Sequence, residues 1–151
     1  MPDPLFDSRT ARFDLPLLFA GQTQKEGFVN EGLARIDALI HLAIEGEQAS
    51  PPASPADGQA WLVASGASGD WSGQAGKIAA RQAGNWFFAM PRDGLKLLNR
   101  STAQELRYAG TWKAASRPAA PSGGSVIDAE ARNAITAILA ALTTAGLIPA
   151  T

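Results

Sequence analysis

The chain has 151 residues, of which 46% are hydrophobic and 18% are charged, so it has enough apolar side chains for a core and lacks the composition of a disordered protein. Lys and Arg total 13 and Asp and Glu total 14, and the resulting net charge of -1 offers no overall positive field for nucleic acid. The sequence contains no cysteine, which excludes disulfides and thiolate metal sites.

The N-terminal region carries neither a secretory signal nor a membrane span. Acids and prolines occupy the first residues, where a signal peptide needs a basic stretch followed by an apolar run. No segment of the chain approaches the roughly 18 uninterrupted apolar residues of a membrane helix. We therefore expect a soluble protein that has neither a membrane nor nucleic acid as a partner.

An extended arm and an amphipathic helix are predicted for residues 1–48. Proline and glycine interrupt the apolar runs of residues 1–29, which favours an arm that lies on another surface. Apolar residues then recur at spacings of three and four behind Asn30, placed as an N-cap, and predict a helix over residues 31–44. Amide and charged side chains gather at this junction and are candidates for docking to a partner or, alternatively, for local capping. The docking candidates are Gln22, Gln24, Lys25, Asn30 and Glu31.

A small antiparallel β-domain is predicted over residues 49–112. The prolines and the Asp-Gly pair of residues 49–58 indicate a linker that ends in a tight turn. Beyond it, short apolar stretches alternate with Gly-rich or polar breaks, which is typical of a β-meander or a barrel-like domain. The five predicted strands are AWLVA, GKIAARQ, NWFFAMP, LKLLN and ELRYAGTW.

A flexible linker and a terminal helix follow the β-domain. Residues 113–124 are rich in Pro, Ala, Ser and Gly, the composition of a tether. Residues 125–151 are predicted to form a helix that is capped at Asp128 and stopped at Gly146. With the preceding regions, this gives an α+β fold that ends in a short coiled-coil helix.

The terminal helix carries apolar residues at heptad spacing, which indicates association with other helices. We call these residues the seam. A lone helix of this length is marginal in water, and isoleucine at both central seam positions favours three strands, so we expect a homotrimer. The alternative is that the helix folds back onto its own chain. The seam residues are Ala131, Ile135, Ile138, Leu142 and Ala145.

Catalytic and cofactor signatures are absent from the sequence. His41 is the single histidine, which makes a nucleophilic triad improbable, and the aspartates are scattered at turns and caps without metal-ligand spacing. The glycines have neither the Lys-Ser/Thr ending nor the strand-turn-helix context of a phosphate-binding loop. We expect no enzyme activity, no cofactor and no metal.

Aromatic residues concentrate in the β-domain, where they fill a core or form a binding surface. Alternation in NWFFAM places Trp86 and Phe88 on one face of a strand and Phe87 on the other. Trp71 is flanked by small turn residues and is the ring most readily placed at the surface, with Arg92 as a polar neighbour for a sugar. A carbohydrate-binding module is therefore the alternative function.

Several motifs resemble an uncharacterised domain family from structural gene clusters of tailed phages and alphaproteobacterial gene transfer agents. These motifs are GQTQK, NEGLARID, DGQAWLVA, GDWSGQAGKIA and GNWFFAMPRDG, and the resemblance covers residues 13–112. The terminal helix is also similar to those that end some phage fibre and spike proteins. The resemblance implies a virion component, assembled in the host cytoplasm with capsid, spike or tail proteins, in some members attaching the particle to host polysaccharide. We therefore expect a subunit of a head spike, fibre or tail appendage.

Overall fold

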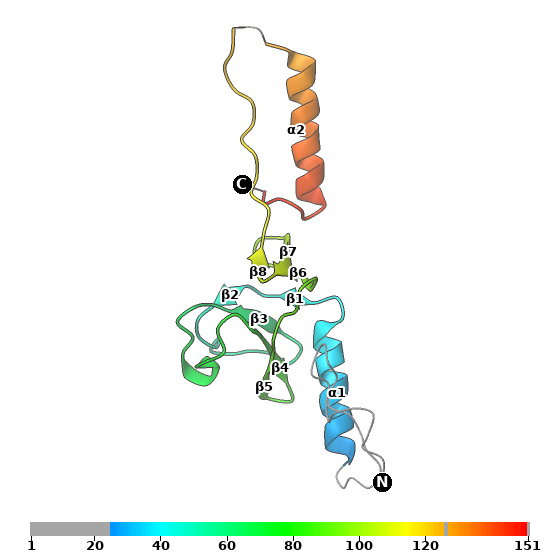
Figure 1. Ribbon diagram of the computed structural model, residues 1–151, viewed down its shortest axis with the longest axis vertical. Helices are drawn as coiled ribbons and strands as arrows, with labels where there is room; N and C mark the ends of the chain where they lie inside the picture. Colours follow the sequence, from blue (N-terminus) through cyan, green and yellow to red (C-terminus); the bar gives the residue numbers. More distant parts are fainter. Residues whose placement is uncertain (1–24, 126, 151) are drawn as a thin grey trace.

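The computed structural model describes residues 25–125 and 127–150, with the backbone alone for residues 25–27 (Figure 1). Helix α1 (Lys25–Leu39) precedes the strands, and helix α2 (Ala129–Thr144) follows them. The described residues thus confirm the expected α+β class with a C-terminal helix. The strands are β1 (Ala43–Ile44), β2 (Glu47–Gln48), β3 (Ala60–Val63), β4 (Ile78–Gln82), β5 (Asn85–Ala89), β6 (Lys96–Asn99), β7 (Gln104–Ala109) and β8 (Thr111–Lys113), with a 3-10 turn at Gly69–Trp71.

The strands form two four-stranded sheets, in the orders β1-β6-β7-β8 and β2-β3-β4-β5. Strands β1 and β6 pair in parallel, as do β2 and β3, whereas the remaining pairs are antiparallel. The chain passes from one sheet to the other between Ile44 and Glu47. The two sheets are mixed, and within the described residues they do not close into a barrel.

All five predicted strands are present, and the last one is divided. Gly110, with a φ of 70°, separates β7 from β8, and its N–H donates a hydrogen bond of 2.8 Å to Oδ1 of Asp93. Strands β1 and β2 were not predicted. Each has two residues. Ile44 of β1 continues the helical spacing of the preceding segment, and Glu47 and Gln48 of β2 are polar, so sequence periodicity could not identify either strand.

Helix α1 has different boundaries from those predicted. Its described part starts at Lys25 and includes Gly27, because a glycine inside a helix costs only about 1 kcal/mol relative to alanine. Asn30 therefore lies within the helix and is not its N-cap. The helix ends at Leu39, and His41 adopts a left-handed conformation with a φ of 49°. Beyond it, the predicted helix gives way to strand β1.

The main core contains residues from both sheets. Ile44 and Leu97 contribute from the first sheet, and Leu62 and Ile78 from the second. Leu39 of α1 packs against this cluster, which attaches the end of the helix to the β-domain. Burial of these aliphatic side chains is the main source of stability for so small a domain.

A second cluster contains three tryptophans on the other face of the β2-β3-β4-β5 sheet. Trp71 is 0% exposed, and its ring centroid lies 6.2 Å from that of Trp61 and 5.1 Å from that of Trp86. Phe88 packs against this cluster and Phe87 against the main core, so the predicted alternation along β5 is confirmed. The predicted surface position of Trp71 is wrong, because the small residues around it let the 3-10 turn fold its ring inward.

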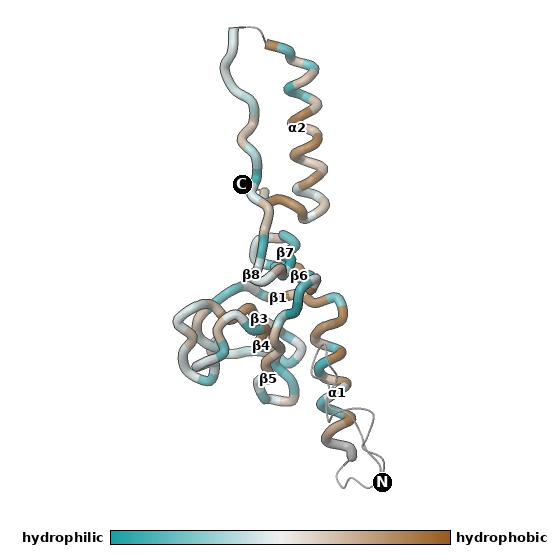
Figure 2. The backbone as a smooth tube through the Cα atoms, in the orientation of Figure 1, coloured by the Kyte–Doolittle hydropathy of each residue, from teal (hydrophilic) through white to brown (hydrophobic). Residues whose placement is uncertain are grey.

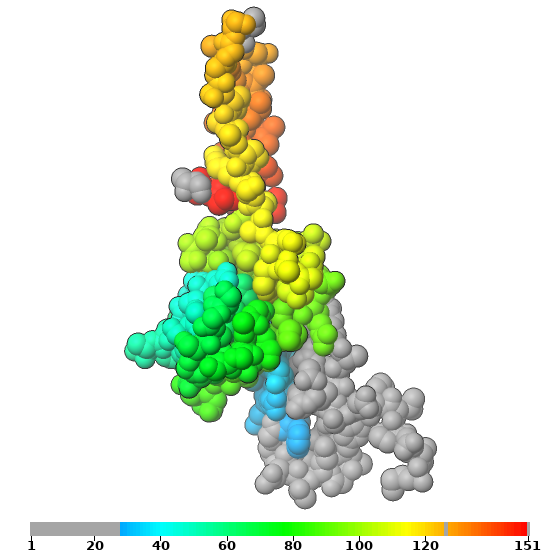
Figure 3. All heavy atoms as spheres, turned by 60° about the vertical axis from the view of Figure 1, so that its left-hand side comes forward, coloured from blue at the N-terminus to red at the C-terminus, as the bar shows by residue number. Residues whose placement is uncertain are grey.

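Helix α2 and the linker lie side by side and project away from the sheets (Figures 1 and 3). The N–H of Ala131 donates a hydrogen bond of 2.8 Å to Oδ1 of Asp128, which confirms the predicted N-cap. The predicted stop is also confirmed, because Gly146 has a φ of 70° just beyond the helix. There the C-terminal turn joins β7, where the N–H of Glu105 donates a 2.7 Å hydrogen bond to the carbonyl oxygen of Gly146.

Candidate functional site

The predicted seam lies exposed along α2. Ile138 is 57% exposed and Ile135 is 41% exposed, although both are large apolar residues. Ala131 and Ala145 are also exposed, and Leu142 is half-buried. Figure 2 shows apolar residues recurring along this helix. The described part of the chain therefore leaves the seam available to another molecule.

The linker covers a different face of α2 from the seam. Leu139 is buried, and Oγ1 of Thr143 accepts a hydrogen bond of 2.8 Å from the guanidinium of Arg117 in the linker. The guanidinium of Arg132 donates a hydrogen bond to the carbonyl oxygen of Gly123. Arg132, Leu139 and Thr143 are spaced by seven and four residues and so share one helix face. The centre of the seam lies about 100° around the helix from that face, at 100° per residue.

The linker therefore supports the helix without covering its apolar stripe. A helix of this length has little stability of its own in water, so its contacts with the linker and with β7 hold it in place. Burial of the seam against another helix would add about 25 cal/mol per Å² of apolar area, before the cost of association is subtracted. The seam is thus an exposed apolar face on a helix that the linker holds from another side.

Helix α1 also presents an apolar stripe to solvent. Its opposite side meets strand β5, where Nη1 of Arg35 donates a 3.4 Å hydrogen bond to the carbonyl oxygen of Phe88 and the guanidinium lies 5.8 Å from the centroid of the Phe87 ring. The helix is thus held by one side while the other is open. The exposed apolar residues of α1 and its C-terminal end are Phe28, Val29, Leu33, Ile36 and Ile40.

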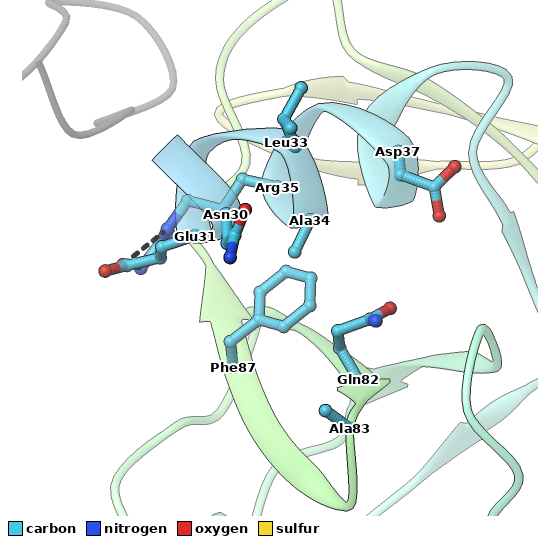
Figure 4. A pocket seen from close by; sticks show the side chains of 9 residues that line it. All are labelled: Asn30, Glu31, Leu33, Ala34, Arg35, Asp37, Gln82, Ala83 and Phe87. Carbon is cyan, nitrogen blue, oxygen red and sulfur yellow. Dashed lines mark hydrogen bonds and ion pairs between the residues drawn. The ribbon is translucent and has the colours of Figure 1, made fainter. Parts of the chain in front are cut away.

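A groove of about 620 Å³ runs between α1 and the β4-β5 hairpin (Figure 4). The Phe87 side chain extends from β5 toward Ala34 of the helix, and Gln82 and Ala83 line the hairpin side. At one end, Oε1 of Glu31 lies 3.0 Å from Nη2 of Arg35. The groove combines an aromatic ring with an ion pair between neighbouring turns of the helix.

Two of the docking candidates line this groove. Asn30 is exposed, and Glu31 is half-buried in its ion pair. Lys25 is the first residue of α1, and Gln22 and Gln24 lie outside the described residues. The apolar stripe of α1 gave a sequence signal at Leu33 and Ile36, whose spacing predicted an amphipathic helix.

The proposed sugar-binding pair does not form a surface site. Trp71 is enclosed by the tryptophan cluster and presents no ring face on which a sugar could stack. Arg92 is exposed in the connection between β5 and β6. A carbohydrate site that depends on Trp71 would require the second core to open.

The residues that the structure describes contain no group of three or more His, Cys, Asp or Glu side chains placed to hold a metal ion. Neither of the two helices over residues 25–39 and 129–144 has the length and apolar character needed to cross a bilayer.

The domain of α1 and the sheets coincides with a known sequence family. The model of the family described as "Protein of unknown function (DUF2793)" matches residues 29–113, which is more than half of the chain. The chain belongs to the DUF2793 family. A comparison with curated proteins found no match. The DUF2793 domain begins near the exposed apolar stripe of α1 and ends at β8, so the linker and α2 follow it as a separate extension.

Proposed function

We propose that this DUF2793 protein is a structural subunit of a phage-like particle, a virion or gene transfer agent, that acts by assembly and not by catalysis. The observation that carries this proposal is the exposed seam of α2. Large apolar residues on one face of a projecting helix are typical of an interaction site. The resemblance of the domain motifs to phage and gene-transfer-agent structural clusters supplies the particle as the setting.

The partner of α2 in this proposal is α2 of further copies, in a homotrimer. Ile135 and Ile138 occupy both central seam positions, an arrangement that favours three strands over two. The alanines at the two ends of the seam permit close approach of the helices. Because the linker occupies another face, each chain can keep its own linker in place while the three helices meet.

The other end of the molecule is proposed to contact capsid, spike or tail proteins. The apolar stripe of α1 is exposed, and the groove beside Asn30 and Glu31 opens between α1 and the β4-β5 hairpin. Helix α1 and α2 lie at opposite ends of the long axis of the molecule (Figure 1). One end can therefore bind the particle while the other joins the copies.

Self-association is tested by light scattering on the full chain and on matched pairs of variants. The wild-type chain is expected to have about three times the mass of the 15.7 kDa monomer. Ile135→Asp combined with Ile138→Asp places charge in the seam and is expected to give a monomer. The control is Ala137→Asp combined with Ala140→Asp, which adds the same charge to the opposite face and should leave the mass unchanged. A monomeric wild type, or equal effects of both pairs, would refute the trimer.

Particle association is tested separately. Particles purified on a density gradient from the cells that produce them are probed with gold-labelled antibody against this chain. We expect label at a defined position on intact particles. Label confined to the soluble fraction would contradict the particle assignment without affecting the trimer, because the two measurements are independent.

A further inference from the structure

The outer face of the β1-β6-β7-β8 sheet carries three cations in one row. Lys96 of β6 is directly opposite Arg107 of β7, and Arg107 is directly opposite Lys113 of β8. All three side chains are exposed. We call Lys96, Arg107 and Lys113 the cationic row. It crosses three adjacent strands, which are about 4.8 Å apart in a β-sheet.

This arrangement is unfavourable for the isolated chain. Like charges directly opposite one another on neighbouring strands destabilise a sheet by a few tenths of a kcal/mol to about 1 kcal/mol per pair. Glu105 forms an ion pair with one end of the row, because its Oε2 lies 3.6 Å from Nζ of Lys96. Within the described residues, one ion pair with a carboxylate is thus seen for three cations, and an anionic ligand would offset the local excess of positive charge.

Positive and negative charges are unevenly distributed along the chain. From Lys96 to the C-terminus there are six Lys and Arg residues and three Asp and Glu residues, whereas residues 1–95 contain seven and eleven. The net charge is thus -4 for residues 1–95 and +3 from Lys96 onward, which gives the total of -1. The cationic row lies in the positive part of the chain, which favours an acidic ligand for this face.

Hollows and apolar side chains accompany the row. A depression of about 380 Å³ is lined by all three cations together with Leu147, and a neighbouring one of about 330 Å³ is lined by Lys96 and Leu98. Leu98 is 42% exposed and Leu147 is 45% exposed. The face therefore combines positive charge with apolar contacts on both sides of it.

We propose that this face binds an acidic segment of a partner protein that also carries apolar side chains. Carboxylates of the segment pair with the cationic row, and its apolar residues contact Leu98 and Leu147. Nucleic acid fits less well, because the residues described as lining the two hollows include no Trp, Tyr or Phe for base stacking, with His41 as their one aromatic ring, and Glu105 repels a continuous phosphate backbone. The inference goes beyond self-association and does not depend on the seam.

The test uses the full chain and a fluorescein-labelled peptide, Gly-Glu-Leu-Glu-Ser-Glu-Leu-Glu-Gly, in fluorescence anisotropy at low and at physiological salt. Wild type is expected to bind, more weakly as salt rises. Arg107→Gln combined with Lys113→Gln is expected to weaken binding at least tenfold. The control, Lys77→Gln combined with Arg100→Gln, removes the same charge elsewhere and should change binding less than twofold.

Charge reversal separates recognition from a loss of folding. Arg107→Glu combined with Lys113→Glu is expected to lose the Glu peptide and to gain binding of the matching peptide with Lys in place of Glu, which an unfolded chain would not do selectively. Absence of binding by wild type, or equal weakening in the row variant and the control, would overturn the proposal. If a twelve-nucleotide oligothymidine binds more tightly than the Glu peptide, and through the same side chains, the proposal would be overturned in favour of nucleic acid.

Discussion

Replacing Trp71 with alanine is expected to destabilise the protein strongly. Trp71 is completely buried in the second core and contacts the rings of Trp61 and Trp86. Truncation of a buried aromatic residue to alanine costs about 3–5 kcal/mol, because apolar burial is lost and a cavity remains. Small domains have a total stability of about 5–15 kcal/mol, so this one change removes a large fraction of it.

The loss is measured by urea denaturation, followed by far-UV circular dichroism because the variant lacks one of the fluorescent tryptophans. With a denaturant slope of about 2 kcal/mol per M, a loss of 4 kcal/mol lowers the urea midpoint by about 2 M. Trp71→Phe retains an aromatic ring and should lose less. Met90→Ala serves as the control, because Met90 is 53% exposed and its truncation should change stability by about 0.5 kcal/mol or less.

A loss below about 1 kcal/mol in Trp71→Ala would refute this reasoning. Such a small loss would mean that the ring contributes little to the core. Trp71 would then again be a candidate for sugar binding. A large loss would instead mean that weaker glycan binding by this variant cannot be taken as evidence for a lectin site.

Two further predictions concern the attachment and start of α2. Gly146→Ala should speed hydrogen exchange at the Glu105 amide and lower stability by about 1–3 kcal/mol, because φ is 70° and a Cβ there would lie 3.3 Å from the carbonyl oxygen of Ala103. Gly94→Ala is its control, because Gly94 has a φ of 91° but a Cβ at this position would have no atom within 4 Å. Equal losses of stability in the two variants would contradict the docked turn. Asp128→Ala should cost α2 about 1 kcal/mol and reduce helical ellipticity, whereas Asp128→Asn retains the cap; equal ellipticity in both variants would contradict the capping role.

Local sequence signals identified most of the fold. The cap at Asp128 and the stop at Gly146 bounded α2, since each is a short-range feature of the backbone. The turn residues between strands bounded the β-domain for the same reason. These signals do not depend on which surfaces meet in the folded molecule.

Features that depend on tertiary contacts were missed. Trp71 sits among small polar residues, and nothing in the sequence shows that the turn carrying it folds over the sheet. The end of α1 could not be predicted from periodicity, because it depends on the burial of Leu42 and Ile44 in the main core. The cationic row is invisible in the sequence, because strand register alone brings Lys96, Arg107 and Lys113 together.

Disulfide trapping along α2 tests the central claim most directly. The chain has no cysteine, so single substitutions report without interference. In a parallel bundle of helices, equivalent seam positions face one another, and Ala131→Cys and Ala145→Cys are expected to form covalent dimers rapidly on mild oxidation. Ala140→Cys lies on the opposite face and should cross-link slowly. Equal rates at all three positions, or no cross-linking at the seam, would contradict association through this face of α2.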